Sequence, residues 1–512
     1  EFFSITLPST GVYALNVRSE GGGNAGLATA DAGTLTLVET TNGTYPSSMN
    51  TTQMTYPQHI RAILVLGLPL VGGHLAQFLI GLTDTIMVGR YGAEYLAALT
   101  LSHTVFFTFF LLGSGFAWAV MPMVANAVAA EDTTRIRRVT RMGLWLSILF
   151  VLLILPFLFF SKPLLLLLGQ ESVVADYAQT YLRIAGVGML PALLVMVLKS
   201  YLAAMEHTRA VFLVTAFAAA LNVPFNYALI FGNWGFPELG IAGAAIASLL
   251  TNFVALGGSM AYAVWKTPEH HLFQRFWKPD WPMFSEVFKL GLPIGLTSLS
   301  EVGLFAASSL FMGWLGTIPL AAHGIVLQIA TAAFMVQVGL SNAATVRAGN
   351  AMGRKDLPHL KRGAKAVQGM SLLLASLAMI PMLVIPAPLI DLFLSANEPD
   401  RLEIIRIGSL LLICAALFQL VDATQVVVLG LLRGLQDTRI PMFLAAIAYW
   451  LLGLPAAYLF GFVADWKGTG VWLGLVAGLA VAAVLLLIRF WGYVRHLEQD
   501  VAQEVAQTPA NP

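Results

Sequence analysis

The chain has 512 residues, of which 58% are hydrophobic and 11% are charged, and its mean hydropathy is +0.77. A soluble globular protein normally carries about twice that charged fraction. The net charge of +1 excludes a broadly basic protein that binds nucleic acid, and the single cysteine, Cys414, excludes an intrachain disulfide framework. The composition therefore predicts an integral membrane protein.

Residues 1–56 do not share this composition. They are polar and rich in Gly, Thr and Ser, and no apolar stretch of the kind found in a secretory signal peptide is evident. We predict a polar N-terminal extension that is disordered or not native to the protein, with Met49 or Met54 as the natural start. A small β-module is the alternative.

From about residue 60, apolar stretches alternate with short polar breaks at Gly, Pro and charged residues. A helix that crosses a bilayer needs about 20 apolar residues. The predicted fold class is an all-α integral membrane protein with twelve transmembrane helices. We expect them at residues 60–88, 96–127, 139–160, 176–205, 209–231, 238–264, 286–313, 320–349, 365–393, 404–432, 438–462 and 470–494.

The distribution of Lys and Arg predicts the orientation. Basic residues concentrate in the loops after even-numbered helices, as at 135–141, 266–289 and 354–365. The loops after odd-numbered helices contain far fewer, namely Arg90, Lys162, Arg401, Arg406 and Lys467. Cytoplasmic loops carry the excess of Lys and Arg, so the even-numbered loops and both termini should be cytoplasmic.

An internal repeat divides the chain into two lobes of six helices. The LGLP run at 66–69 recurs at 290–293, and the same offset of 224 residues relates Asn126 to Asn350. Because six is an even number, both copies insert in the same direction and should be related by a pseudo-twofold axis along the membrane normal. The predicted segments are an N-lobe at 57–265, a cytoplasmic inter-lobe loop at 266–285, a C-lobe at 286–497 and a cytoplasmic polar tail at 498–512.

Three carboxylates, Asp84, Glu301 and Asp422, lie inside predicted membrane helices. Each costs about 2.5–3.5 kcal/mol to insert, so such residues persist mainly where they bind an ion, a proton or a cationic ligand. Lys289 and Arg433 mark the cytoplasmic edge of their helices. At 1.5 Å per residue, Glu301 lies roughly 18 Å from Lys289 and Asp422 roughly 16 Å from Arg433, so both acids fall near the middle of the membrane at matching depth. We predict that Glu301 and Asp422 bind Na⁺ or share a proton, with a structural hydrogen-bonded pair as the alternative.

Asp84 lies towards the outer end of its helix, and an interfacial charge near Arg90 is the alternative interpretation. A functional role is favoured by Asn222 and Asn226, which share one face of the fifth helix around Pro224. A proline there frees backbone carbonyls for a ligand or a partner helix. We therefore predict a polar site in the N-lobe.

The repeat is asymmetric in its charges, since Glu301 corresponds to Gln77 and Asp84 corresponds to Ser308. We therefore include Gln77 in a secondary cavity with Asn222, Asn226 and Phe418.

Phe418 precedes Asp422 by one helical turn and is a candidate for cation–π binding, with ordinary packing as the alternative. Lys199 is expected to snorkel to the cytoplasmic edge of its helix. Three membrane histidines lack metal-ligand spacing and are expected to be hydrogen-bonded core residues: His74, His103 and His323.

The chain contains no P-loop, no dinucleotide fingerprint, no nucleophile elbow and no zinc motif. Nothing therefore indicates ATP hydrolysis or covalent chemistry. We expect no enzyme activity and no cofactor. If the chain is a transporter, its energy must come from an ion gradient, with Na⁺ or H⁺ as the coupling ion.

Several runs resemble motifs of the multidrug and toxic compound extrusion (MATE) family. They are GLTDTIMVG at 81–89, LGLP at 290–293 followed by Glu301 and the AAH run at 321–323, FQLVD at 418–422 with LRGLQDT at 432–438, and NVPFNY at 222–227. The last is similar to the NorM-like branch. The resemblance covers residues 57–497, and one departure is Gly324, where many relatives have Gln.

The resemblance implies a monomeric, multi-pass exporter of the bacterial inner membrane that exchanges Na⁺ or H⁺ for amphipathic organic cations. It also implies coupling roles for Asp84, Glu301 and Asp422. A lipid or lipid-linked oligosaccharide flippase of the same superfamily is the first alternative, but its phosphate-bearing cargo would require basic cavity residues. A membrane receptor or scaffold is the second alternative, and an intramembrane enzyme is the third.

Overall fold

A computed structural model describes residues 54–91, 93–167, 169–394 and 399–507, together with two short strands. The chain forms two compact units, Glu1–Gln53 and Met54–Pro512. In the first unit, strand β1 (Ser4–Ile5) pairs antiparallel with β2 (Leu35–Thr36). The predictions for the other residues of 1–53, and for 508–512, lie outside the described residues.

Twelve helices of the described part are long and apolar enough to cross a membrane, which confirms the predicted number. The N-lobe contains α1 (Tyr56–Tyr91), α2 (Ala93–Ala129), α3 (Thr133–Phe159), α4 (Ser161–Leu167), α5 (Ser172–Ala204), α6 (Thr208–Phe231) and α7 (Ile241–Lys266), with 3₁₀ turns at Asn233–Gly235 and Pro268–His270. The C-lobe contains α8 (Trp281–Leu315), α9 (Thr317–Gly353), α10 (Leu357–Val384), α11 (Pro386–Asp391), α12 (Arg401–Gly434), α13 (Arg439–Ala446), α14 (Leu454–Tyr458) and α15 (Lys467–Gln507).

Several helix bounds differ from the prediction for local reasons. Helix α3 begins six residues early because the side chain of Asp132 accepts a hydrogen bond from Arg135 N at 2.8 Å and caps the first turn. The eleventh span is interrupted by two π-helical segments, Ile447–Gly453 and Leu459–Val463. Helix α15 continues to Gln507, so the described part of the predicted polar tail is helical.

Large apolar side chains cover the outside of the helical unit. Leu152 and Leu153 on α3 are 59% and 66% exposed, and Leu213 and Phe217 share an exposed face of α6. A continuous apolar surface of this extent is stable in hydrocarbon and not in water. The chain is therefore a multi-pass membrane protein.

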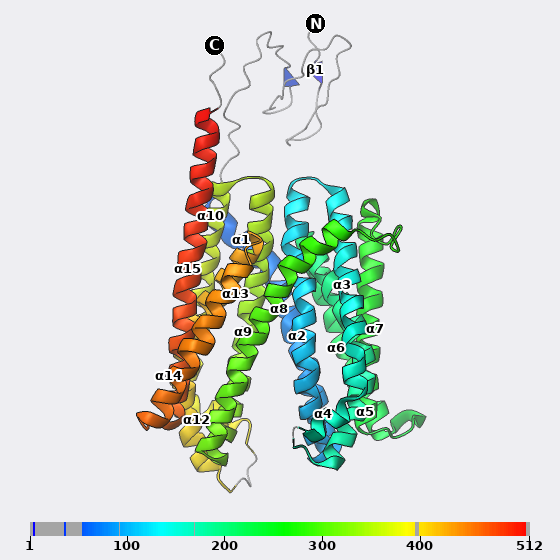
Figure 1. Ribbon diagram of the computed structural model, residues 1–512, viewed down its shortest axis with the longest axis vertical. Coiled ribbons are helices and arrows are strands. Elements are labelled where there is room, and N and C mark those ends of the chain that lie inside the picture. The colour runs from blue at the N-terminus through cyan, green and yellow to red at the C-terminus, as the bar shows by residue number, and fades with distance from the viewer. Residues whose placement is uncertain are drawn as a thin grey trace. The chain divides into compact units, whose positions relative to one another are not determined.

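The two lobes form separate bundles that meet through few helices (Figure 1). Helix α2 packs on α8 and α9, and α1 packs on α9. The α2–α8 contact is so close that a Cβ on Gly115 would lie 2.5 Å from Gly295 N. Equivalent positions at an offset of 224 residues make the α9–α1 contact, where a Cβ on Gly339 would lie 2.7 Å from Val71 N. The pseudo-twofold relation of the repeats is thus present in the contacts between the lobes.

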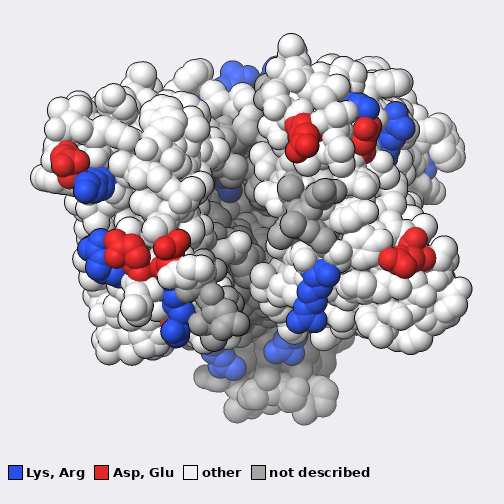
Figure 2. Space-filling model, turned by 90° about the horizontal axis from the view of Figure 1, so that it is seen from below, with Lys and Arg blue, Asp and Glu red and all other residues white. Residues whose placement is uncertain are grey.

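A deep groove separates the lobes at one end of the helical unit. Figure 2 shows this face, which is the end where α4 and α14 lie in Figure 1. At the opposite end, α3 and α8 are joined by ion pairs between Arg135 and Glu286 and between Arg138 and Asp280. The helical unit is therefore open at one end and closed at the other.

Candidate functional site

Asp84 lies in a polar site inside the N-lobe and is 3% exposed. Asn226 Nδ2 on α6 donates to Asp84 Oδ1 at 2.6 Å, and Ser248 Oγ on α7 donates to Oδ2 at 2.8 Å. Asn226 Nδ2 also donates to Asn222 Oδ1 at 3.0 Å, so both of its N–H groups are used. Asp84 is therefore not an interfacial charge.

The donors around Asp84 are all neutral. No Lys, Arg or His of the described residues forms an ion pair with this carboxylate. An ionised carboxylate that is buried without a positive partner is costly, and a proton or a small cation would offset that cost. The site is thus chemically suited to take up one positive charge.

A second polar site lies in the C-lobe between α8 and α12. Gln425 Nε2 donates to Glu301 Oε1 at 3.3 Å, and Asp422 lies one turn before Gln425 on the same face of α12. Asp422 is 1% exposed and interacts electrostatically with Glu301. The structure therefore brings the two predicted acids into one site, together with an amide that the prediction did not include.

Four oxygen atoms of the C-lobe site have no hydrogen-bond partner among the described residues. They are both carboxylate oxygens of Asp422, Oε1 of Gln425 and the hydroxyl of Tyr449, which is fully buried. A buried polar group without a partner costs about 1–3 kcal/mol. Oxygen donors suit Na⁺, and the carboxylates also suit a proton. No group of three His, Cys, Asp or Glu side chains occurs in the described part of the chain, so a bound cation would need the neutral donors as well.

Tyr449 was missed because the local backbone is irregular. It lies in the π-helical segment Ile447–Gly453, which packs against α8, the helix that carries Glu301. π-Helical turns recur at functional sites, but an apolar sequence run does not reveal one. Gln425, in contrast, could have been found from its spacing of three residues from Asp422.

The ring of Phe418 is buried and does not face an open cavity. It is 3% exposed, and its ring packs edge-on against Phe305 and Trp472, with ring centroids 5.8 and 5.7 Å away. The predicted cation–π role therefore has no exposed ring face to support it in this conformation, and the role stays a prediction.

Gln77 and Lys199 lie together on the N-lobe side. Lys199 Nζ donates to Gln77 Oε1 at 3.5 Å, so the lysine does not snorkel to the cytoplasmic edge as predicted. His74, one turn before Gln77, is joined across the lobe interface by Asn342 Nδ2 on α9, at 2.9 Å from His74 Nε2. These residues link the inside of the N-lobe to the C-lobe.

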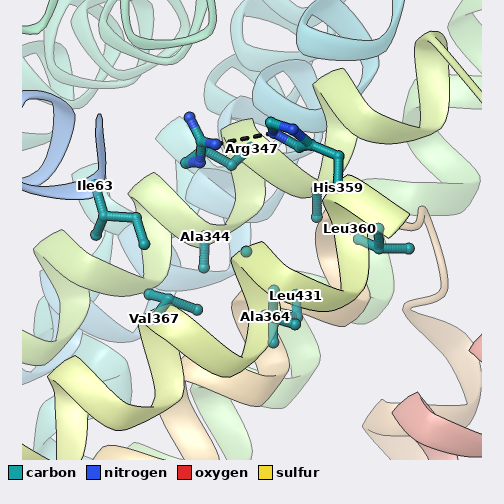
Figure 3. A pocket seen from close by; sticks show the side chains of 10 residues that line it. Ile63, Ala344, Arg347, His359, Leu360, Ala364, Val367 and Leu431 are labelled. Carbon is teal, nitrogen blue, oxygen red and sulfur yellow. Dashed lines mark hydrogen bonds between the residues drawn. The ribbon is translucent and has the colours of Figure 1, made fainter. Parts of the chain in front are cut away.

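A cluster around Arg347 closes the end opposite the groove. Arg347 Nη2 donates to His59 Nδ1 at 3.1 Å and to His359 Nε2 at 2.9 Å, and the two imidazole rings lie 4.6 Å apart. Figure 3 shows Arg347 and His359 beside a cavity of about 10 Å³, lined further by Ile63 and Leu431. Because His59 belongs to α1 and the other two residues to the C-lobe, the cluster joins the lobes.

Further polar contacts surround this closed end. Asn350 on α9 donates to Glu206 Oε1 at 3.3 Å, and Arg433 on α12 lies over the ring of Trp118 on α2, 5.6 Å from its centroid. The hydrogen bond from Arg138 holds the pKa of Asp280 below its usual value. The closed end is therefore sealed by charged and polar contacts as well as by helix packing.

The chain is similar to known transporters over most of its length. The MatE family model matches residues 69–228 and 293–459. A probable multidrug resistance protein NorM of Rhizobium meliloti (strain 1021) is 46% identical over 445 residues, covering 86% of this chain and 95% of the relative. A protein of the same description from Agrobacterium fabrum (strain C58 / ATCC 33970) is 45% identical over 434 residues, covering 84% and 93%.

Solved structures share the fold. A crystal structure of MATE in the bent conformation has a TM-score of 0.78 at 20% identity and covers 88% of this chain and 100% of that chain. An outward-facing multidrug resistance MATE family transporter of the MOP superfamily has a TM-score of 0.76 at 21% identity, covering 86% and 96%. The family match, the close relatives and the shared two-lobed fold show that this chain belongs to the MatE family.

Proposed function

We propose that this chain is a secondary active multidrug exporter that moves amphipathic organic cations out of a bacterial cell in exchange for Na⁺ or H⁺. The observation that carries the proposal is the C-lobe site, where Asp422 and its neighbours keep buried oxygens without hydrogen-bond partners. The relatives described as probable multidrug resistance proteins support the same function.

The coupling follows from the charge of this site. When Glu301 and Asp422 are both ionised, they attract a cationic substrate more strongly than they do after a proton or Na⁺ has neutralised one of them. An ion that enters from outside through the groove would therefore displace the substrate. The substrate leaves through the same groove, and the protein then returns to the state that is open to the cytoplasm.

The proposed orientation places the even-numbered loops and both termini in the cytoplasm of a cell with an inner membrane. The groove of Figure 2 then opens to the outside, and the Arg347 cluster closes the cytoplasmic end. The protein would act as a monomer without a cofactor.

The alternative is a flippase for lipid or lipid-linked oligosaccharide. Its phosphate-bearing cargo needs cations in the cavity, and Lys199 is a candidate because no ion pair with a described carboxylate neutralises it. Glu301 and Asp422 favour a cationic cargo instead.

Ethidium efflux from proteoliposomes tests the proposal. Wild type, Glu301→Gln and Asp422→Asn are compared under an imposed Na⁺ gradient and then under an imposed pH gradient. The matched control is Glu403→Gln, an exposed acid on α12 that pairs with Arg406 one turn away. We expect efflux under one gradient in wild type and control, and the rate of protein-free liposomes in the other two variants. Full efflux in Asp422→Asn would contradict the coupling role, and no efflux under either gradient would favour the flippase.

A further inference from the structure

A polar cavity of about 530 Å³ lies at the closed end, between the start of α3 and the loop that joins α7 to α8. Five basic side chains line it: Arg137, Arg138, Arg141, Arg275 and Lys278. The acidic residue in its lining is Asp280. None of the residues that line the cavity belongs to the polar sites of the two lobes, and the proposed transport function does not use it.

The single acid leaves most of this positive charge uncompensated. Arg138 binds both oxygens of Asp280, at 2.5 Å from Nε to Oδ2 and 3.1 Å from Nη2 to Oδ1. Asp280 Oδ1 also accepts from Met283 N and caps α8. Among the described residues, the other four basic side chains of the cavity form no ion pair. The cavity therefore has a strong net positive charge.

Arg141 is the buried member of the group. It is 8% exposed, its Nη1 donates to the carbonyl oxygen of Arg275 at 3.2 Å, and its Nε has no partner in the described part of the chain. A guanidinium group that is buried without a carboxylate is costly. An anion in the cavity would offset that cost, and a phosphoryl group matches the planar fork of arginine.

The surroundings indicate where such an anion would come from. Trp277 and Trp281 beside the cavity are 76% and 62% exposed, and Trp265 at the end of α7 is 71% exposed. Exposed tryptophans at helix ends are typical of the membrane–water interface, at the level of the lipid headgroups. Basic pockets between membrane helices on the cytoplasmic side are suited to anionic headgroups.

We propose that this cavity binds the phosphoryl headgroup of an anionic phospholipid from the cytoplasmic leaflet. The site joins the lobes, because Arg138 belongs to α3 and Asp280 precedes α8. A headgroup bound to the remaining cations holds α3 and the loop before α8 together. The lipid thus favours the conformation that is closed at this end, and the composition of the leaflet influences the conformational equilibrium.

Lipid retention tests the proposal on the purified full chain. The protein is equilibrated with vesicles of phosphatidylcholine alone, or of phosphatidylcholine with a minor fraction of phosphatidylglycerol, and bound lipid is counted by native mass spectrometry. The variant Arg137→Gln/Lys278→Gln removes two cavity charges. Its matched control, Arg354→Gln/Lys355→Gln, removes two charges from the loop after α9, outside the cavity. Thermal melting and size-exclusion profiles establish that both variants are folded.

We expect wild type and control to retain phosphatidylglycerol, and the cavity variant to bind it on the order of 25-fold more weakly, about fivefold for each cation removed. Excess inorganic phosphate should not displace the lipid. Equal retention by both variants would overturn the proposed site. Displacement by inorganic phosphate, or equal retention from the two kinds of vesicle, would overturn the lipid as its ligand.

Discussion

The contact between α2 and α8 makes a quantitative prediction about the conformational equilibrium. In Gly115→Ala, the new Cβ would lie 2.4 Å from Gly291 O and 2.5 Å from Gly295 N, and Cβ atoms do not approach backbone atoms to within 3.0 Å. The obstructing atoms belong to a helix backbone, so they cannot rotate away as a flexible side chain can. The two lobes must therefore move apart where α2 packs on α8.

Overpacking of this kind costs about 1–3 kcal/mol. The cost applies to the conformation described here, in which these backbones touch and the groove is open. Its population should therefore fall roughly 5- to 150-fold relative to a conformation in which the groove is closed and α2 and α8 have separated. The matched control is Gly81→Ala on α1, where a new Cβ meets nothing within 4 Å. Both variants gain about 0.5–1 kcal/mol of helix propensity, so the control measures that contribution separately.

Spin-label distances across the groove measure the shift. The chain has one cysteine, so labels can be placed at Leu167→Cys and Leu392→Cys in a Cys414→Ser background. These positions are 82% and 80% exposed at the groove ends of the two lobes. Gly115→Ala should move the distance distribution towards shorter values, while Gly81→Ala should leave it unchanged. A folded Gly115→Ala protein with the wild-type distribution would refute the reasoning.

The same label pair tests the Arg347 cluster. Arg347→Gln removes the hydrogen bonds to His59 and His359 and should also shift the distribution towards a closed groove, whereas the exposed Arg354→Gln should not. A third prediction concerns pH and His270, whose pKa is lowered from its ordinary value of 6.5 by burial beside Tyr201. Its neutral form stabilises the fold fully above pH 6.5, and this contribution should fall as the pH decreases towards the lowered pKa. Thermal unfolding should show that slope in wild type and a weaker one in His270→Asn; equal slopes would contradict it.

Most of the fold could be predicted because a membrane helix is specified locally. Length, apolar composition and loop charge are sufficient to place twelve spans, and the repeat relates the lobes. The shared helix face of Asn222 and Asn226 could be predicted from their spacing, but their contact with Asp84 is seen only in the structure. A residue whose position depends on an irregular backbone segment could not be placed in the site from the sequence. Tyr449 lies in a π-helical segment that packs against α8, and no periodicity rule predicts such a segment.

The closed end was beyond sequence reasoning for a different reason. Arg347, His59 and His359 come from three helices, and each looks ordinary in its own segment. Their contact depends on how the two lobes are arranged in this conformation, which no single segment of the sequence specifies. Likewise, the basic loop residues predicted the orientation of the chain, but only the folded loop shows that several of them line one cavity.

The asymmetry of the lobes supports one last prediction. Glu301 and Gln77 are equivalent positions in the repeat, so the double variant Gln77→Glu/Glu301→Gln moves the carboxylate to the matching place in the N-lobe. We expect no recovery of gradient-driven ethidium efflux, because the environments differ. At residue 77 the ammonium of Lys199 is 3.5 Å away and would pair with a new carboxylate. At residue 301 the neighbours are Gln425 and Asp422, which leave oxygens free for an incoming cation. Adding Lys199→Met to the double variant removes the competing charge, and recovery only then would show that Lys199 prevents the exchange. Recovery in the double variant itself would show that the position within the repeat, rather than its neighbours, determines the coupling.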